Sequence, residues 1–155
     1  MARFNLNPIS NMSENPKTEE IVLPRPLINR LLHHAQTFPG LEICGLIGAN
    51  EDSPTTCYPI ENIADDQSHR FVMDPHEQID AMRKIRDNHE ELFAIYHSHP
   101  SSPAQPSTTD LELAEYPDTL QLIISLKTKG VLEMRGFRLN GKKSVQEVIL
   151  TLASE

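Results

Sequence analysis

The sequence predicts an α/β (α+β) fold in which helices pack on one mixed central β-sheet. A length of 155 residues fits one domain with a proper core. Two amphipathic segments of helical period alternate with short apolar runs that read as strands. Three further strands close the chain, with Asn140-Gly141 as a hairpin turn between the last two. Residues 1–20 are polar and aperiodic, so we expect a flexible tail there and a single domain over 21–155.

In the N-terminal half, Pro24 and Pro26 open a helix that we expect to end before Phe38. Its predicted apolar face comprises Leu27, Leu31, Leu32 and Ala35. The apolar run 41–48 predicts a buried strand, and 55–60 predicts a second one after a polar turn.

Asp74-Pro75 carries the signals of a helix cap and a first helical residue, and predicts a second helix. Its expected apolar stripe comprises Ile79, Met82 and Ile85. A buried strand over 92–96 then delivers two histidines at its C-terminal end.

The remaining segments follow from proline, serine and apolar spacing. A loop over 100–106 leads to a short helix that begins at Ser107 and stops at Pro117. The closing strands are expected near 120–126, 131–139 and 144–151.

Composition excludes several functions. A net charge of −8 argues against nucleic-acid binding, which needs clustered Lys and Arg. No apolar run approaches the roughly 18 residues of a membrane span, and no apolar leader follows Arg3. With only Cys44 and Cys57 as thiols, we expect a cytoplasmic protein, although a disulfide between the two stays open.

The segment from Tyr96 to Asp110 carries the chemistry. On a strand, His97 and His99 point to the same face, so both imidazoles can reach one point. On a first helical turn, Ser107 and Asp110 also share a face. Two imidazoles and one carboxylate form a three-ligand zinc set with an open fourth position, as hydrolytic sites have.

Each part of this pattern also has a purely structural interpretation. Ser107 is a good helix N-cap, and Asp110 suits any helix N-terminus. Glu42, in an otherwise apolar run, could face solvent at the strand edge. Near a zinc site, however, its carboxylate could take a proton from water and return it to the leaving amine.

These residues together resemble the JAMM signature of the MPN-domain metalloproteases. The segment Glu42-x-Cys44-Gly45-Leu46-x-Gly48, then Asn62, then Phe71-x-Met73-Asp74-Pro75 and the block from Tyr96 to Asp110 resemble the stand-alone prokaryotic branch in order and spacing. The resemblance covers about residues 22 to 150. It implies a single MPN-like domain with cytidine-deaminase-like layering.

The resemblance also implies roles by position. His97, His99 and Asp110 would ligate Zn²⁺, Glu42 would be general base and acid, and Ser107 would hydrogen-bond the oxyanion. Ser98 points to the opposite strand face, so we expect it to be structural. The implied activity is that of a zinc metallopeptidase. Its substrate would be a ubiquitin-like or sulfur-carrier protein, cut at a peptide or isopeptide bond after a C-terminal Gly-Gly.

Other functions stay open at this stage. The chain could be a non-catalytic module that binds ubiquitin-like proteins and uses zinc only for its fold. A cysteine peptidase with Cys44 as nucleophile is weaker, since a cysteine in an apolar run is usually a buried small hydrophobe. An amidohydrolase or phosphoesterase barrel typically needs about 250 residues, so this chain of 155 residues is too short for that alternative. The carrier and the oligomeric state are not predicted, and five histidines are expected at the surface: His33, His34, His69, His76 and His89.

Overall fold

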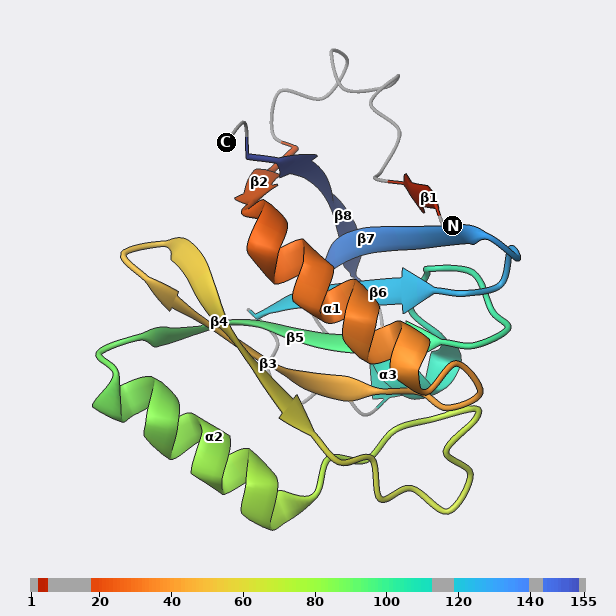
Figure 1. Cartoon of the computed structure of the whole chain (residues 1–155), viewed down its shortest axis with the longest axis horizontal. Coiled ribbons are helices and arrows are strands. Elements are labelled where there is room, and N and C mark those ends of the chain that lie inside the picture. The colour runs from red at the N-terminus through yellow and green to blue at the C-terminus, as the bar shows by residue number, and fades with distance from the viewer. Residues whose placement is uncertain (1–2, 6–17, 113–118, 140–143, 154–155) are drawn as a thin grey trace.

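The computed structural model describes residues 3–5, 18–112, 119–139 and 144–153 of the chain (Figure 1). The helices are α1 (Arg25–Thr37), α2 (Pro75–Asp87) and α3 (Thr108–Glu112). The strands are β1 (Arg3–Asn5), β2 (Glu20–Leu23), β3 (Cys44–Asn50), β4 (Ser53–Ile60), β5 (Glu91–His99), β6 (Leu120–Ser125), β7 (Val131–Leu139) and β8 (Val145–Leu152). Within the expected tail, β1 and Glu20 therefore take part in the sheet.

The described strands form one eight-stranded mixed sheet, which confirms the predicted fold class. Its order is β2-β8-β7-β6-β5-β3-β4, and β1 pairs with one end of β7. β5 lies in the centre, antiparallel to β3 and parallel to β6. A central strand is held on both sides, so the residues at the end of β5 have a fixed register.

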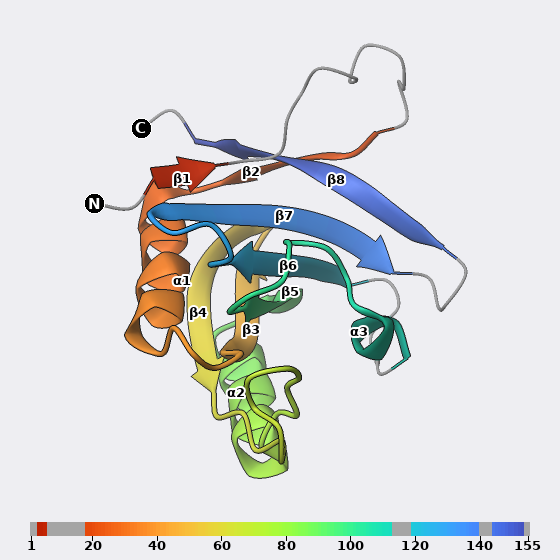
Figure 2. The same cartoon turned by 90° about the vertical axis from the view of Figure 1, so that its right-hand side faces the viewer.

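One face of the sheet is covered by α1, which packs on the larger core. The helix crosses this face diagonally in Figure 1, and α3 lies on the other side of the sheet in Figure 2. The buried residues of α1 are Leu27, Ile28, Leu31 and Ala35. The predicted apolar face is therefore confirmed, except that Leu32 is only partly buried. They pack against the sheet residues Ile47, Ala94 and Leu122 among others.

The opposite face carries α2, whose orientation differs from the prediction. The Asp74 side chain accepts a hydrogen bond from the His76 amide, as expected of a cap. Ala81 and Ile85 are buried against Leu46 and Ile95, but Ile79 is 60% exposed. The predicted stripe was therefore wrong at Ile79, because packing on the sheet rotates the helix toward the smaller Ala81.

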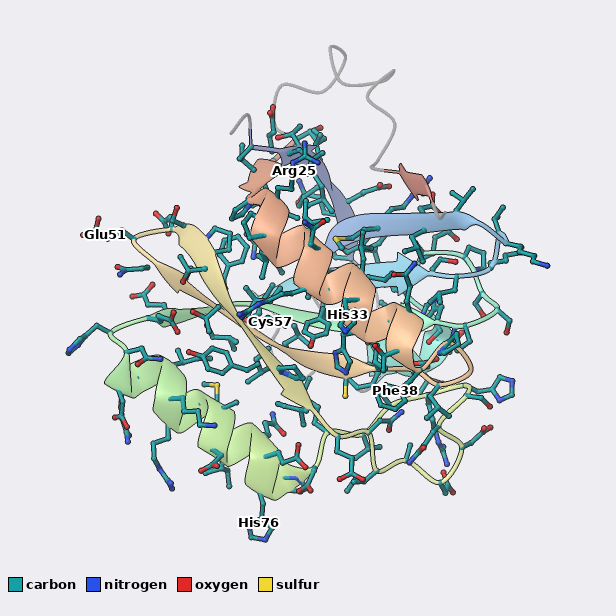
Figure 3. The ribbon with its side chains drawn as sticks, viewed as in Figure 1. Arg25, His33, Phe38, Glu51, Cys57 and His76 are labelled. Carbon is teal, nitrogen blue, oxygen red and sulfur yellow. The ribbon has the colours of Figure 1, made fainter. Side chains whose placement is uncertain are left out.

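The remaining boundaries are close to the predicted ones. β3 begins at Cys44 rather than at 41, and the hairpin to β4 turns through Glu51 and Asp52. Glu51 marks the tip of this hairpin in Figure 3, and His76 projects outward at the start of α2. The expected helix stop at Pro117 and the turn at Asn140-Gly141 lie outside the described residues.

Two expectations from composition can be compared with the structure. Cys44 and Cys57 are both buried and free, so the disulfide that stayed open is not formed. Over the described part of the chain, none of the helices combines the length and apolarity needed to cross a membrane.

Candidate metal centre

The two histidines of the motif lie in the last three residues of β5, at the centre of the sheet. His97 pairs with Cys44 of β3 on one side and with Ile123 of β6 on the other. Both imidazoles leave the same face of the strand and are almost completely buried, at 1% and 2% exposure. The prediction that His97 and His99 address one point is confirmed.

The carboxylate arrives from α3 through a reciprocal cap. The Asp110 amide donates to Ser107 Oγ at 3.0 Å, and the Ser107 amide donates to Asp110 Oδ2 at 2.9 Å. The capping interpretation of this pair is therefore correct. It does not compete with a metal role, because the cap fixes Asp110 Oδ2 where it faces the histidines.

Three potential ligand atoms converge at one point beside the end of β5. His97 Nε2 lies 3.1 Å from His99 Nε2, and Asp110 Oδ2 lies 3.1 and 3.2 Å from these two atoms. Zinc with ligands at about 2.0–2.1 Å in tetrahedral geometry separates them by roughly 3.3 Å. These residues fit the ion.

The two rings are held in different ways. His99 Nδ1 lies 2.7 Å from the Pro103 carbonyl oxygen. A carbonyl only accepts, so Nδ1 carries the proton and, in the neutral ring, Nε2 offers its lone pair to the centre. His97 Nδ1 is buried without a partner among the described residues, and the Phe71 ring stacks on this imidazole at 4.5 Å between centroids.

The surroundings of Asp110 keep its carboxylate ionised. Burial tends to raise the pKa of Asp110, but the neighbouring His97 and His99 rings and the Ser107 amide outweigh it and hold that pKa well below its usual range. Burial tends to lower the pKa of His99, and the contact with Asp110 raises it overall. An ionised carboxylate beside two imidazoles is a donor set that suits Zn²⁺.

Glu42 lies just before β3 and joins the same group. Its carboxylate offers an oxygen within 4.8 Å of the ligand atoms of the other three residues. The side chain is 5% exposed and Oε1 has no partner among the described residues, so the solvent-facing interpretation is wrong. Desolvation raises the pKa of Glu42 to about 7, which suits a group that accepts and returns a proton near neutral pH.

Ser98 fixes the segment that carries Glu42. Its hydroxyl accepts the Ile43 amide at 2.9 Å and donates to the Leu41 carbonyl at 3.3 Å. Its own amide donates to the Ile43 carbonyl at 3.0 Å, which continues the β3–β5 register past Cys44. The expected structural role of Ser98 on the opposite face is thus specific: it anchors both neighbours of Glu42.

The cysteine alternative does not fit this geometry. Cys44 is fully buried, and its thiol contacts the Ile60 carbonyl. Burial raises the pKa of the Cys44 thiol to about 12, so the thiolate that a nucleophile requires is absent at neutral pH.

The contacts of three residues in this region were not predicted from the sequence, although Asn62 and Phe71 both stood in the resemblance. Asn62 is buried and makes hydrogen bonds at both ends of its amide. Phe71 contacts a candidate ligand, although only its place in the resemblance pointed to it. His34 is half-buried and bonds the Tyr96 hydroxyl at 2.8 Å, so it is not the solvated side chain we expected.

A cavity of about 430 Å³ opens beside Glu42. Phe38, just after α1, and Ile60 of β4 contribute apolar side chains to its wall, and Asn62 and Gln67 line it on the loop side. Glu42 thus lines this cavity and also belongs to the cluster with the two histidines.

The chain is similar to known proteins over most of its length. A family profile described as "Prokaryotic homologs of the JAB domain" matches residues 24–139. A CysO-cysteine peptidase of Mycobacterium tuberculosis is 31% identical over 121 residues, which are 77% of this chain and 82% of the relative. A desampylase of Haloferax volcanii is 33% identical over 89 residues, which are 56% of this chain and 64% of that protein.

Solved structures agree with the fold. A protein from Desulfitobacterium hafniense has a TM-score of 0.76 at 34% identity, and the match covers 87% of this chain and 94% of that one. A JAB1/MPN domain protein from Archaeoglobus fulgidus has a TM-score of 0.57 at 18% identity, covering 86% and 98%. This second likeness concerns the fold alone.

Proposed function

The chain belongs to the family of prokaryotic homologues of the JAB domain, and from this membership and its site we propose that it is a zinc-dependent metallopeptidase. The observation that carries the proposal is the convergence of His97 Nε2, His99 Nε2 and Asp110 Oδ2 to within 3.2 Å of one another, beside the buried carboxylate of Glu42. Similarity to the CysO-cysteine peptidase and to the desampylases supports a ubiquitin-like or sulfur-carrier protein as the substrate.

The residues divide the work as follows. His97, His99 and Asp110 would hold Zn²⁺, which when bound polarises a scissile carbonyl and acidifies water. Glu42 takes a proton from the attacking water and returns it to the leaving amine, so that one carboxyl serves both halves of the hydrolysis. Ser107 accepts the Asp110 amide and keeps its own hydroxyl proton free to donate to the oxyanion.

The substrate that we propose ends in Gly-Gly before the bond that is cut. The bond is either a peptide bond to an added residue or segment, or an isopeptide bond to a lysine. Two substrates separate these cases: a ubiquitin-fold carrier extended by one residue after Gly-Gly, and the same carrier joined to a lysine side chain. Mass spectrometry of the products then identifies the bond.

The decisive variant is Glu42→Gln, which keeps the shape of the side chain and removes its basicity. We expect about one zinc per chain and no cleavage. Glu51→Gln is the matched control, because the same change is made at the exposed tip of the β3–β4 hairpin. Cleavage by Glu42→Gln at the parent rate contradicts the mechanism, whereas tight zinc and carrier binding without any hydrolysis by the parent favours the non-catalytic binding module.

A further inference from the structure

Asn62 lies at the centre of the hydrogen bonds that shape the loop of residues 62–73. The side-chain amide donates to the carbonyl of Glu42 at 2.9 Å and to that of Arg70 at 3.0 Å. Its carbonyl oxygen accepts the amides of Ala64 and Val72, both at 3.0 Å. Donors and acceptors are thus matched at each end, which fixes the orientation of the amide.

The loop contacts Glu42 at a second point. The Glu42 amide donates to the Gln67 main-chain carbonyl at 2.8 Å, and Gln67 Nε2 donates to the main-chain carbonyl of Asn62 at 2.7 Å. Both backbone polar groups of Glu42 are therefore held by this loop, the carbonyl by Asn62 itself and the amide by Gln67.

The same loop also reaches the metal ligands. Phe71, next to the Arg70 carbonyl that Asn62 holds, stacks on the His97 ring with an interplanar angle of 29°. Asn62 pairs with Met73 across the base of the loop, and the Ile63 amide donates to the Val72 carbonyl at 2.8 Å. One buried side chain thus closes a loop that touches both Glu42 and His97.

We propose that Asn62 is a positioning residue for the hydrolysis. Its side chain fixes the backbone of Glu42 relative to the backbone next to Phe71, whose ring stacks on His97. The inference rests on the proposed function. Ser98 fixes both neighbours of Glu42, and Asn62 fixes Glu42 itself, so the proton acceptor is held from two directions. A carboxylate without a hydrogen-bond partner at Oε1 depends on such backbone anchors for its position.

The test compares Asn62→Ala and Asn62→Asp with the parent. Asn62→Asp is the second variant because it keeps an acceptor for the Ala64 and Val72 amides and replaces the donor to the Glu42 and Arg70 carbonyls with a second acceptor oxygen. We expect zinc content near that of the parent and kcat lower by roughly 10- to 100-fold at a nearly unchanged KM.

Amide hydrogen exchange on the zinc-free protein gives a readout that does not depend on activity. We expect exchange at the Glu42 amide to rise about 10-fold or more, while the Ile47 amide in the middle of β3 keeps its protection. A merely structural role accelerates both amides together and leaves the kcat of the folded, zinc-loaded enzyme unchanged.

Two control variants test whether a change in the loop, or a loss of stability, is by itself enough to lower kcat. Ser68→Ala removes contacts to Asp66 and His69 in the exposed part of the same loop and should leave kcat unchanged. Ile85→Val weakens the core under α2 and leaves the hydrogen bonds of Asn62 in place, so we expect lower stability and an unchanged kcat. If the parent cleaves and both Asn62 variants keep its kcat, the inference fails and the proposed function stands. If the parent cleaves none of the carriers, the proposed function fails, and the exchange data alone decide whether Asn62 anchors Glu42.

Discussion

Asp110→Asn separates the charge of the carboxylate from its role as a cap. Asp110 Oδ2 lies 3.1 Å from His97 Nε2 and 3.2 Å from His99 Nε2, and also accepts the Ser107 amide at 2.9 Å. An asparagine oxygen can still accept from Ser107, so α3 keeps its N-terminal cap. The variant loses the anionic member of the three-ligand set.

The expected magnitude follows from metal-site chemistry. Loss of a group that only supports a ligand typically weakens metal binding by 10- to 100-fold. Loss of charge on a ligand itself should reach at least about 100-fold, which is about 2.7 kcal/mol at 25 °C. Because zinc that binds only the folded state stabilises it by RT ln(1 + [Zn]/Kd), the same ~2.7 kcal/mol should disappear from the zinc-dependent part of the free energy of unfolding.

Chelator competition measures the zinc affinity, and urea unfolding with and without zinc measures the linked stability. Asp80→Asn is the control, since it removes a carboxylate from the exposed surface of α2. We expect its zinc affinity to equal that of the parent. A zinc affinity of Asp110→Asn within about twofold of the parent value refutes the assignment of Asp110 as a ligand, because the charge would then make almost no contribution.

Two further predictions concern the groups beside the metal. In Ser107→Ala we expect kcat to fall about 10²- to 10³-fold at unchanged zinc content, with about 1 kcal/mol less stability from the lost cap; steady-state kinetics with metal analysis measures both, and an unchanged kcat contradicts the donor role. In the zinc-free protein, burial raises the pKa of Glu42 from 4.5 to about 7, so the folded state binds this proton more tightly than the unfolded state. Stability should therefore fall as the pH rises through that window, and urea unfolding should show a steeper fall for the parent than for Glu42→Gln; equal slopes contradict the burial of this carboxyl.

The parts of the site that could be predicted from the sequence depend on short separations. His97 and His99 share a face through the period of a strand, and Ser107 and Asp110 meet through the first turn of a helix. Both relations hold wherever the element forms, so they need no knowledge of the tertiary fold. Helix starts at Pro24-Arg25 and Asp74-Pro75 were predictable for the same reason.

The parts that could not be predicted depend on packing between distant segments. The Ile79 side chain fits the period of an apolar stripe, but the rotation of α2 is set by the sheet beneath it. His34 reaches Tyr96 across 62 positions of sequence. The resemblance includes Asn62 but does not show its partners, because they are backbone groups that come together only after the loop has closed.

The proposed ligands are close together in the sequence and Glu42 is distant from them, so substitutions should affect metal binding and turnover differently. The three proposed ligands lie within residues 97–110, on one strand end and one short helix joined by a loop, so metal binding depends on local structure. Glu42 is held beside them by the pairing of β3 with β5, the Ser98 hydroxyl, the Gln67 carbonyl and the Asn62 amide. Changes near Glu42 and Asn62 should therefore lower turnover while zinc stays bound, and changes in 97–110 that remove a ligand should lower both. Metal affinity and turnover are thus separable in this fold because the ion and the proton acceptor are placed by different parts of the chain.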